Sequence, residues 1–286
     1  MDSKTLNLLV HDREAACYDE RFAIDYSRIA RAVRLDMESL LGSSPAVARR
    51  ALDFCCGTGY AAIGLAAAGY ATEVHACDLS SAMLERTQKN AADAGVAVPV
   101  AQCDGEMLPY ADSSFDLVVA RGALHHLPSP LDGLREVRRV LQPGGTAVVL
   151  AEPTEAGEKQ VAAVVGTLAR GVDALRRRRG RDKDPEHHQW ELASMAANLH
   201  TFSRRDIASL AREAGFADVR VETAWWSWIL ALGLNYYLSG ESRFVESNPA
   251  ARSIRYALVD GAQMLDRFAG TLVPARWRHT VQAVLR

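Results

Sequence analysis

The sequence lacks the marks of a secreted, membrane-spanning or strongly nucleic-acid-binding protein. Its apolar runs are shorter than the roughly 20 residues that span a bilayer, and no positively charged start leads into an apolar segment, so secretion is not indicated. The balance of 33 Lys and Arg against 35 Asp and Glu, a net charge of -2, gives no general attraction for nucleic acid or anionic lipid. We therefore expect no nucleic-acid partner and no stable membrane insertion, with peripheral membrane contact left open.

Cysteine is also scarce. The 286 residues contain five cysteines, and four of them fall at the ends of expected strands rather than in loops where disulfides are common. The adjacent Cys55 and Cys56 lack the C-x-x-C spacing of many metal and redox sites, and a buried cysteine usually behaves as a small apolar residue. The composition predicts a reducing, cytoplasmic location and no metal site.

Short apolar runs alternate with amphipathic stretches from Ala46 onward. This alternation is typical of βαβ units and predicts an α/β fold with a mostly parallel sheet. We expect seven strands, the last antiparallel beside the sixth. They are expected at 51–55, 73–78, 98–103, 115–120, 145–151, 217–223 and 278–285.

Helical segments precede and interrupt this alternation. Two interruptions are too long to be structureless connections, so we expect them to be helical insertions that cover a binding site. A capping-box-like start at Ser203 marks the helix that resumes the core. The expected division is a helical cap (1–45), a cofactor-binding α/β core (46–153), a helical lid insertion (154–202), a core helix and strand (203–223), an apolar helical insertion (224–273) and a last strand (274–286).

The most informative segment is the run from Leu52 to Gly59, LDFCCGTG, which is followed by Asp78 at the end of the next apolar run. A strand that breaks into a glycine turn and then a helix exposes backbone N–H groups at the carboxyl end of the strand. An acidic residue that ends the next strand can accept hydrogen bonds from ribose hydroxyls. Together these features predict a nucleoside cofactor at the edge of the sheet.

Three further motifs follow in order: DGEMLP from Asp104, SFD from Ser114, and LQPGG from Leu141. With the glycine turn and Asp78, this set resembles the core of class I S-adenosylmethionine-dependent methyltransferases, near the small-molecule, type 11-like group that includes the quinone-type enzymes. The resemblance covers about a third of the chain, from Leu52 to Pro153. It implies a Rossmann-like methyltransferase sheet with helical lid insertions and S-adenosylmethionine as the cofactor.

The resemblance also implies roles for individual residues. Asp53 would hold the ammonium group of the cofactor, Asp78 the ribose hydroxyls, and Asp104 the adenine amino group. Cys55 stands where the family has its first glycine, and it narrows the space beside the cofactor. The full set of implied cofactor residues is Asp53, Cys55, Gly57, Gly59, Asp78, Leu79, Met83, Asp104, Gly105, Met107, Ala120 and Arg121.

His125 and His126 follow the fourth strand and are the candidate catalytic residues. Catalytic groups in such sheets gather at the carboxyl ends of the strands, and histidine can take a proton from an attacking hydroxyl or amine near neutral pH. A purely structural role for this pair is the alternative, because methyl transfer needs mainly an aligned nucleophile.

The candidate acceptor site contains Tyr18, Trp225 and Trp228. Tyr18 begins a Tyr-Asp pair of the kind that, in related enzymes, belongs to a helix covering the cofactor. The two tryptophans lie in an aromatic, apolar stretch that predicts either a wall of the acceptor pocket or an ordinary core helix. A basic run, Arg176 to Arg179, fits either a phosphate contact or a solvated loop.

We therefore predict transfer of a methyl group to an apolar small molecule, such as a natural-product, quinone-like or lipid intermediate. Two other enzyme classes stay open at this stage: a nucleic-acid methyltransferase and a nicotinamide-dependent oxidoreductase of Rossmann type. A protein that binds the cofactor without catalysis is a further alternative. A homodimer is one option for its assembly.

Overall fold

We describe the fold from a computed structural model of the chain. It describes residues 2–42, 46–178, 197–225, 227, 230–231, 249–269, 272–274 and 277–286. Parts of both helical insertions therefore lie outside the described residues, as do Trp228 and the side chains of Arg176 to Arg179.

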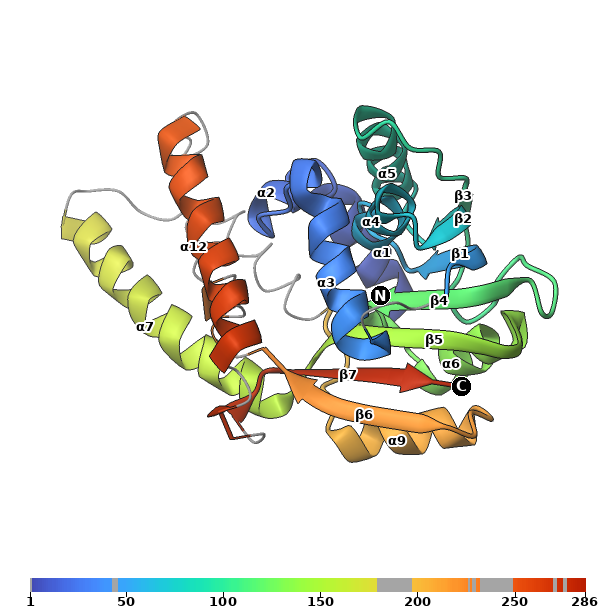
Figure 1. Ribbon diagram of the computed structural model, residues 1–286. Coiled ribbons are helices and arrows are strands. Elements are labelled where there is room, and N and C mark those ends of the chain that lie inside the picture. Colours follow the sequence, from blue (N-terminus) through green and yellow to red (C-terminus); the bar gives the residue numbers. More distant parts are fainter. Residues whose placement is uncertain are drawn as a thin grey trace.

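A seven-stranded sheet with the order β3-β2-β1-β4-β5-β7-β6 forms the centre of the fold (Figure 1). Only β7 runs antiparallel to its neighbours. This confirms the predicted mostly parallel α/β sheet. The strands are β1 (Ala48–Phe54), β2 (Ala71–Asp78), β3 (Val100–Gln102), β4 (Phe115–Arg121), β5 (Leu141–Pro153), β6 (Val219–Ala224) and β7 (Thr280–Leu285).

The strand ends differ from the sequence prediction mainly at β3 and β5. β3 ends at Gln102, and the last bond of its ladder with β2 is the one that the N–H of Cys103 donates to the carbonyl of Asp78. β5 begins at Leu141, before the glycines. Leu141 pairs with Phe115, and an irregularity in the register lies between this pair and the rest of the β4–β5 ladder.

Helices cover both faces of the sheet (Figure 1). One face packs against α3 (Ile29–Leu41) and α4 (Tyr60–Ala68), with α5 (Ser81–Asp93) beside them, and the other packs against α6 (Pro130–Val140) and α9 (Arg204–Glu213). The serines before α5, α6 and α9 cap their helices through side-chain oxygens, and Ser203 and Asp206 form the predicted capping box. Each face thus buries its own apolar cluster, which holds the strand ends in place.

The N-terminal cap contains α1 (Ser3–Glu14), α2 (Tyr18–Arg21) and the short 3-10 helix η1 (Tyr26–Arg28). α1 begins at Ser3, because the Asp2 carboxylate caps it by accepting the N–H of Thr5. Ser80, at the start of α5, donates its hydroxyl to Asp12 of α1. These contacts dock α1 near the carboxyl end of β2.

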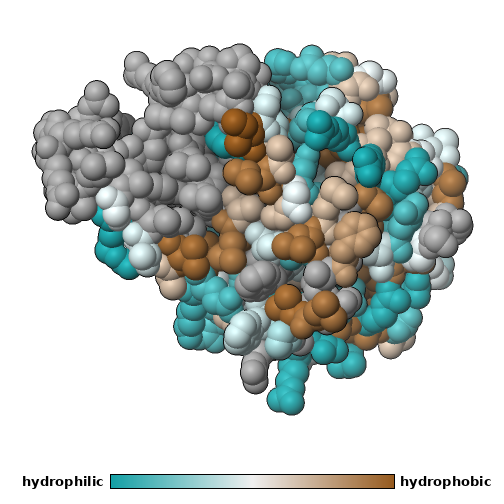
Figure 2. Space-filling model, turned by 60° about the vertical axis from the view of Figure 1, so that its left-hand side comes forward, coloured by the Kyte–Doolittle hydropathy of each residue, from teal (hydrophilic) through white to brown (hydrophobic). Residues whose placement is uncertain are grey.

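Two long helices, α7 (Glu155–Arg178) and α12 (Pro249–Ala269), stand beside the sheet on the side where β5 and β6 end (Figure 1). This side comes forward in Figure 2, where hydrophobic side chains gather in the middle of the visible face. Within the described part of the chain, no helix combines the length and the apolar character that a bilayer crossing requires.

Candidate cofactor and active site

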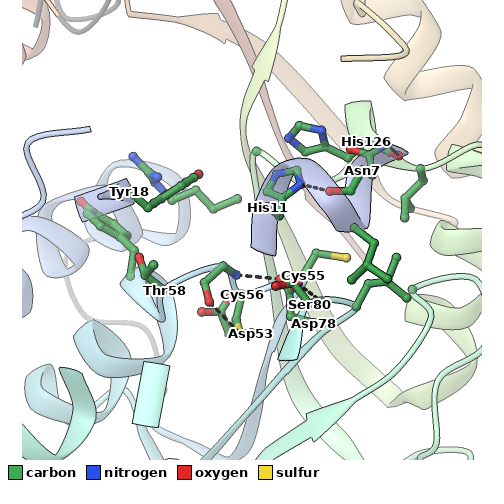
Figure 3. A pocket seen from close by; sticks show the side chains of 18 of the residues that line it. Asn7, His11, Tyr18, Asp53, Cys55, Cys56, Thr58, Asp78, Ser80 and His126 are labelled. Atoms are coloured by element: carbon green, nitrogen blue, oxygen red, sulfur yellow. Dashed lines mark hydrogen bonds between the residues drawn. The ribbon is translucent and has the colours of Figure 1, made fainter. Parts of the chain in front are cut away.

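A cavity opens where the carboxyl ends of β1, β2 and β4 meet the N-terminal cap (Figure 3). It encloses about 920 Å³ of empty space, part of it open to solvent. Its lining includes Lys4, Asn7, His11, Tyr18, Ile24, Asp53, Cys55, Gly57, Thr58, Tyr60, Asp78, Leu79, Ser80, Asp104, Gly105, Arg121, Gly122, His126 and Leu127. The sequence-predicted strand ends therefore meet at one site.

Asp78 lies at the floor of the cavity, at the last position of β2. Its carboxylate accepts the N–H of Gly57 at 2.8 Å and the N–H of Ser80 at 2.9 Å. Burial raises the pKa of Asp78, and the two backbone donors partly offset that rise. The carboxylate joins the turns that follow β1 and β2, and it is placed to accept further hydrogen bonds from a ligand.

The glycine turn after β1 brings the backbone close to the cavity. Gly57 has a φ of +54°, and a Cβ added there would meet only open space, so this backbone faces the cavity without obstruction. Gly59 has a φ of +90°, and a Cβ there would lie 2.8 Å from a methyl group of Thr87. The turn is thus a cradle of backbone with no side chain at Gly57, which fits a bound nucleoside cofactor.

Cys55 adopts a left-handed backbone conformation, with a φ of +54°. That conformation is unfavourable for residues other than glycine, and the resemblance described above places glycine at this position. The thiol also crowds the cavity, since it lies 3.1 Å from where a Cβ of Gly105 would be. The cysteine therefore combines backbone strain with a narrowed pocket.

Asp53 is almost fully buried, and its carboxylate accepts the N–H of Ala62 at 2.7 Å. Burial raises its pKa to about 7. The carboxylate stabilises the start of α4 while lining the cavity near the glycine turn. A cationic group in the cavity would favour its charged form.

Asp104 and Gly105 line one end of the cavity, away from the glycine turn. A Cβ at Gly105 would lie 3.0 Å from the Phe54 ring, so the backbone there packs closely. The ammonium of Lys4, on α1, forms ion pairs with Asp104 at 2.5 Å and with Glu106 at 2.6 Å. Lys4 thereby fastens α1 across this end of the cavity.

Tyr18 lines the other end of the cavity, and the adjacent Asp19 holds this segment in place (Figure 3). Asp19 is buried and accepts hydrogen bonds from Arg86 and Asn90 of α5, at 2.8 and 3.1 Å. The guanidinium of Arg121 stacks over the Tyr60 ring, 4.0 Å from its centre. These contacts place a cation and two aromatic rings beside the glycine turn.

The two candidate catalytic histidines sit in the 3-10 turn η2 (Leu124–His126) after β4. The buried carboxylate of Glu152 accepts the N–H groups of Ala123, Leu124 and His125, and the His125 ring bonds to it through Nδ1 at 2.9 Å. Because a carboxylate accepts, Nδ1 of His125 carries the proton. Glu152 therefore holds η2 in place and determines which ring nitrogen of His125 carries the proton.

Only His126 of this pair lines the cavity. Its Nδ1 lies 3.2 Å from the carbonyl oxygen of Ala197, which can only accept, so Nε2 is left as a proton acceptor. Burial, followed by the neighbouring His125 and His11, lowers the pKa of His126 well below its usual value. His126 is thus neutral at neutral pH, as a general base must be.

Several predicted residues lie away from the cavity wall. Met83 and Ala120 are buried in the core, whereas Met107 is 74% exposed on the outside of the turn that follows β3. Gly59 belongs to the turn after β1 but does not line the cavity. Trp225 is buried in an apolar cluster with Val259 and Phe22, and the structure does not place it in the lining.

The sequence analysis missed Lys4, Asn7 and His11, all on α1. Asn7 donates to the carbonyl of His126, and the His11 ring meets the His126 ring edge-on, 4.7 Å between centres. The three residues follow a spacing of three and four, which places them on one helical face. The spacing can be read from the sequence. However, α1 is not strongly amphipathic, and the cavity residues that it contacts lie far away in the sequence.

No group of three or more His, Cys, Asp or Glu side chains within the described ranges is arranged to hold a metal ion.

Comparison with known proteins identifies the family. A family model described as "Methyltransferase domain" matches residues 52–149. Demethylmenaquinone methyltransferase of Geobacillus kaustophilus (strain HTA426) is 33% identical over 187 residues, which cover 61% of this chain and 73% of that protein. The enzyme of the same name from Staphylococcus aureus (strain JH9) is 33% identical over 177 residues, covering 61% and 70%.

Solved structures share the fold at lower identity. A putative sarcosine dimethylglycine methyltransferase from Galdieria sulphuraria has a TM-score of 0.54 at 16% identity, covering 91% of this chain and 85% of that one. Phosphoethanolamine N-methyltransferase 2 of Haemonchus contortus, solved with S-adenosyl-L-methionine, has a TM-score of 0.55 at 17% identity, covering 89% and 52%. The [4+2]-cyclase SpnF has a TM-score of 0.51 at 20% identity, covering 90% and 78%.

The chain belongs to the class I S-adenosylmethionine-dependent methyltransferases, and its cofactor is S-adenosylmethionine. The observed cradle fits this cofactor, because an open glycine backbone lies beside the buried carboxylate of Asp53 and the partly buried carboxylate of Asp78. Membership of this family rules out the nicotinamide-dependent oxidoreductase that the sequence had left open.

The backbone strain at Cys55 can be measured by comparing Cys55→Gly with Cys55→Ala. Both changes remove the thiol, but only glycine relieves the left-handed conformation, so we expect the glycine variant to be more stable by about 1 kcal/mol. Urea unfolding monitored by circular dichroism gives the difference. An alanine variant as stable as the glycine variant would show that the conformation carries no strain.

The raised pKa of Asp53 predicts a pH dependence of stability. Between pH values near its ordinary pKa of 3.8 and its folded pKa of about 7, the folded protein keeps a proton that the unfolded chain has lost. The contribution of Asp53 to the free energy of unfolding therefore falls as pH rises through this window, by about 1.4 kcal/mol for each unit of pKa shift. Unfolding of wild type and Asp53→Asn at pH 5 and pH 8 tests this. We expect the stability of Asp53→Asn relative to wild type to increase from pH 5 to pH 8, and an unchanged difference would contradict it.

Proposed function

We propose that this methyltransferase acts on an apolar, quinone-like aromatic acceptor. The observation that carries the proposal is the similarity to two enzymes named as demethylmenaquinone methyltransferases over most of their length. The cavity is compatible with such an acceptor, because Tyr18, Ile24 and Leu127 contribute apolar surface beside the polar groups. An aromatic ring would pack against this surface.

The cavity residues form three groups, each of which would contact a different part of the cofactor. Asp104 and Gly105 would hold the adenine, Asp78 the ribose hydroxyls, and the glycine turn with Asp53 the methionine part. Arg121, between Tyr60 and the glycine turn, is placed to pair with the cofactor carboxylate. Leu79 would form an apolar wall on the adenine ring.

When bound, S-adenosylmethionine supplies a methyl group activated by a positively charged sulfur. The work of the protein is then to position the acceptor and to exclude water. Lys4 and Asp19 serve this end, because their ion pairs hold α1 and α2 over the two ends of the cavity.

We assign the role of general base to His126. Its Nε2 is free of the backbone contact made by Nδ1, and its lowered pKa keeps the ring neutral. His126 can therefore take the proton from an acceptor hydroxyl or ring carbon as the new bond to the methyl group forms. His125, stacked 3.9 Å from it and held by Glu152, is a positioning residue.

The acceptor class is tested with S-adenosylmethionine carrying a labelled methyl group. The purified chain should transfer label to a demethylated quinol with a short isoprenoid tail, and not to the same molecule with its nucleophilic position already methylated. Binding of S-adenosylmethionine without label in the quinol would reject this acceptor class. Incubation of the chain and the labelled cofactor with a cell extract would then show which metabolite is the true acceptor. An extract in which no metabolite gains label would indicate that the chain binds the cofactor without catalysis.

The assignment of the base predicts unequal effects of the two histidines. His126→Gln should lower kcat by roughly 100-fold or more, with cofactor affinity changed only slightly, whereas His125→Gln should lower kcat less and reduce stability. Because the base must be neutral, the wild-type rate should stay level below pH 6.5, down to the lowered pKa of His126. Rates measured from pH 5 to pH 8 check both points. Equal loss of kcat in the two variants would contradict the assignment.

A further inference from the structure

Helix α12 presents its apolar side to solvent. The α12 side chains that the structure describes as exposed are Ser253, Ile254, Ala257, Leu258, Gly261, Met264, Leu265 and Phe268. None of these eight is charged. A surface helix normally turns its apolar stripe toward the core and its charges outward, so the orientation of α12 is inverted.

Three charged residues of α12 have described partners away from this stripe. Arg255 is buried and donates to the carbonyl of Glu20, Asp260 pairs with Arg28 at 2.6 Å, and Asp266 accepts from Ser227. Val259 packs on the same side against Phe22 and Trp225. These contacts hold α12 against the N-terminal cap and fix which side faces out.

The outward stripe follows the spacing of a helix-pairing seam. Ile254, Leu258, Gly261, Leu265 and Phe268 recur at intervals of four, three, four and three residues, which is the heptad spacing at which two helices pack against each other. The stripe is also nearly symmetric about Gly261. In an antiparallel pair with a two-fold axis at Gly261, Ile254 of one copy meets Phe268 of the other, and Leu258 meets Met264.

The size of the stripe is sufficient for such a pair. The exposed fractions are 62% for Ile254, 59% for Leu258, 51% for both Met264 and Leu265, and 81% for Phe268. Side chains of these sizes present on the order of 600 Å² per copy, so two copies would bury at most about 1,200 Å², the lower limit for a specific interface. An apolar patch of this size matches the largest on a typical monomer, and such patches often serve a function.

Charge distinguishes a second copy from a lipid surface. Helices that lie on membranes usually carry Lys and Arg on their outer margins to meet the headgroups. The exposed α12 side chains that the structure describes include neither, and Arg252 and Arg267 lie outside the described side chains. An equally uncharged surface matches the described stripe, and a second copy of that stripe provides it.

We propose that the protein forms an antiparallel homodimer through the α12 stripe, with Gly261 at the two-fold axis. A Cβ added at Gly261 would meet nothing within 4 Å, so the two helices can approach closely there. Because the inner side of α12 contacts the cap segment that follows Tyr18, the dimer braces the cap next to the cavity. This proposal does not depend on the acceptor class.

Sedimentation equilibrium of the full chain tests the interface. Wild type should have twice the mass of one chain at micromolar concentration, and the double variant Leu258→Glu/Leu265→Glu the mass of one chain. Val47→Glu, which charges an exposed apolar residue elsewhere, should remain dimeric. All three should be folded by circular dichroism and bind S-adenosylmethionine. A monomeric wild type, or a double variant that stays dimeric, would overturn the proposal.

Disulfide formation tests the orientation in a nearly native chain. Gly261→Cys should give an oxidised dimer, because the two cysteines meet at the axis. Ala257→Cys should not, since the two copies of that residue would be displaced by about 12 Å along the helix, beyond disulfide reach. Linking at both positions would indicate a parallel pair and reject the antiparallel one. Binding of monomeric wild type to neutral phospholipid vesicles, lost in the double variant, would assign the stripe to a lipid surface instead.

Discussion

Three carboxylates at strand ends, those of Asp53 and Glu152 buried and that of Asp78 partly buried, hold together the edge of the sheet that forms the cavity. Asp53 near the end of β1 accepts the N–H of Ala62, Asp78 at the end of β2 accepts from Gly57 and Ser80, and Glu152 in β5 accepts from three successive residues after β4. A buried charge is tolerated only when it is paired or well hydrogen-bonded. The turns that surround the cavity are therefore tied to the strands, and the positions of the cofactor groups follow from these bonds.

The cavity combines a rigid floor with a cover drawn from distant parts of the chain. The floor comes from turns between strands and helices of the core, whereas the cover consists of α1 and α2, attached by ion pairs such as Lys4–Asp104 and Arg86–Asp19. The Lys4–Asp104 pair is partly exposed and contributes little to stability. Asp19 is buried, so losing its pair with Arg86 would cost more. α12 also contacts this cover.

Many features of the site could be predicted from local sequence. The glycine turn and Asp78 were identified because each acts through a backbone geometry that its own motif specifies, whereas Asp104 and Gly105 were identified from the resemblance to the methyltransferase family. Met83 and Met107 lie away from the cavity wall, one buried and the other exposed, because side-chain direction depends on how a helix or turn packs. Lys4 and His11 were missed for a related reason: their partners lie about 100 residues away in the sequence.

The amino-acid sequence alone determined the seven-stranded α/β fold and the class of cofactor, because strand periodicity, capping residues and glycine turns act over a few neighbouring residues. Only the tertiary structure distinguished His126, which faces the cavity, from His125, which is held by Glu152. It also decided that the apolar side of α12 faces outward. A hydrophobic stripe specifies that something must cover it, but which surface it meets depends on contacts between residues far apart in the chain.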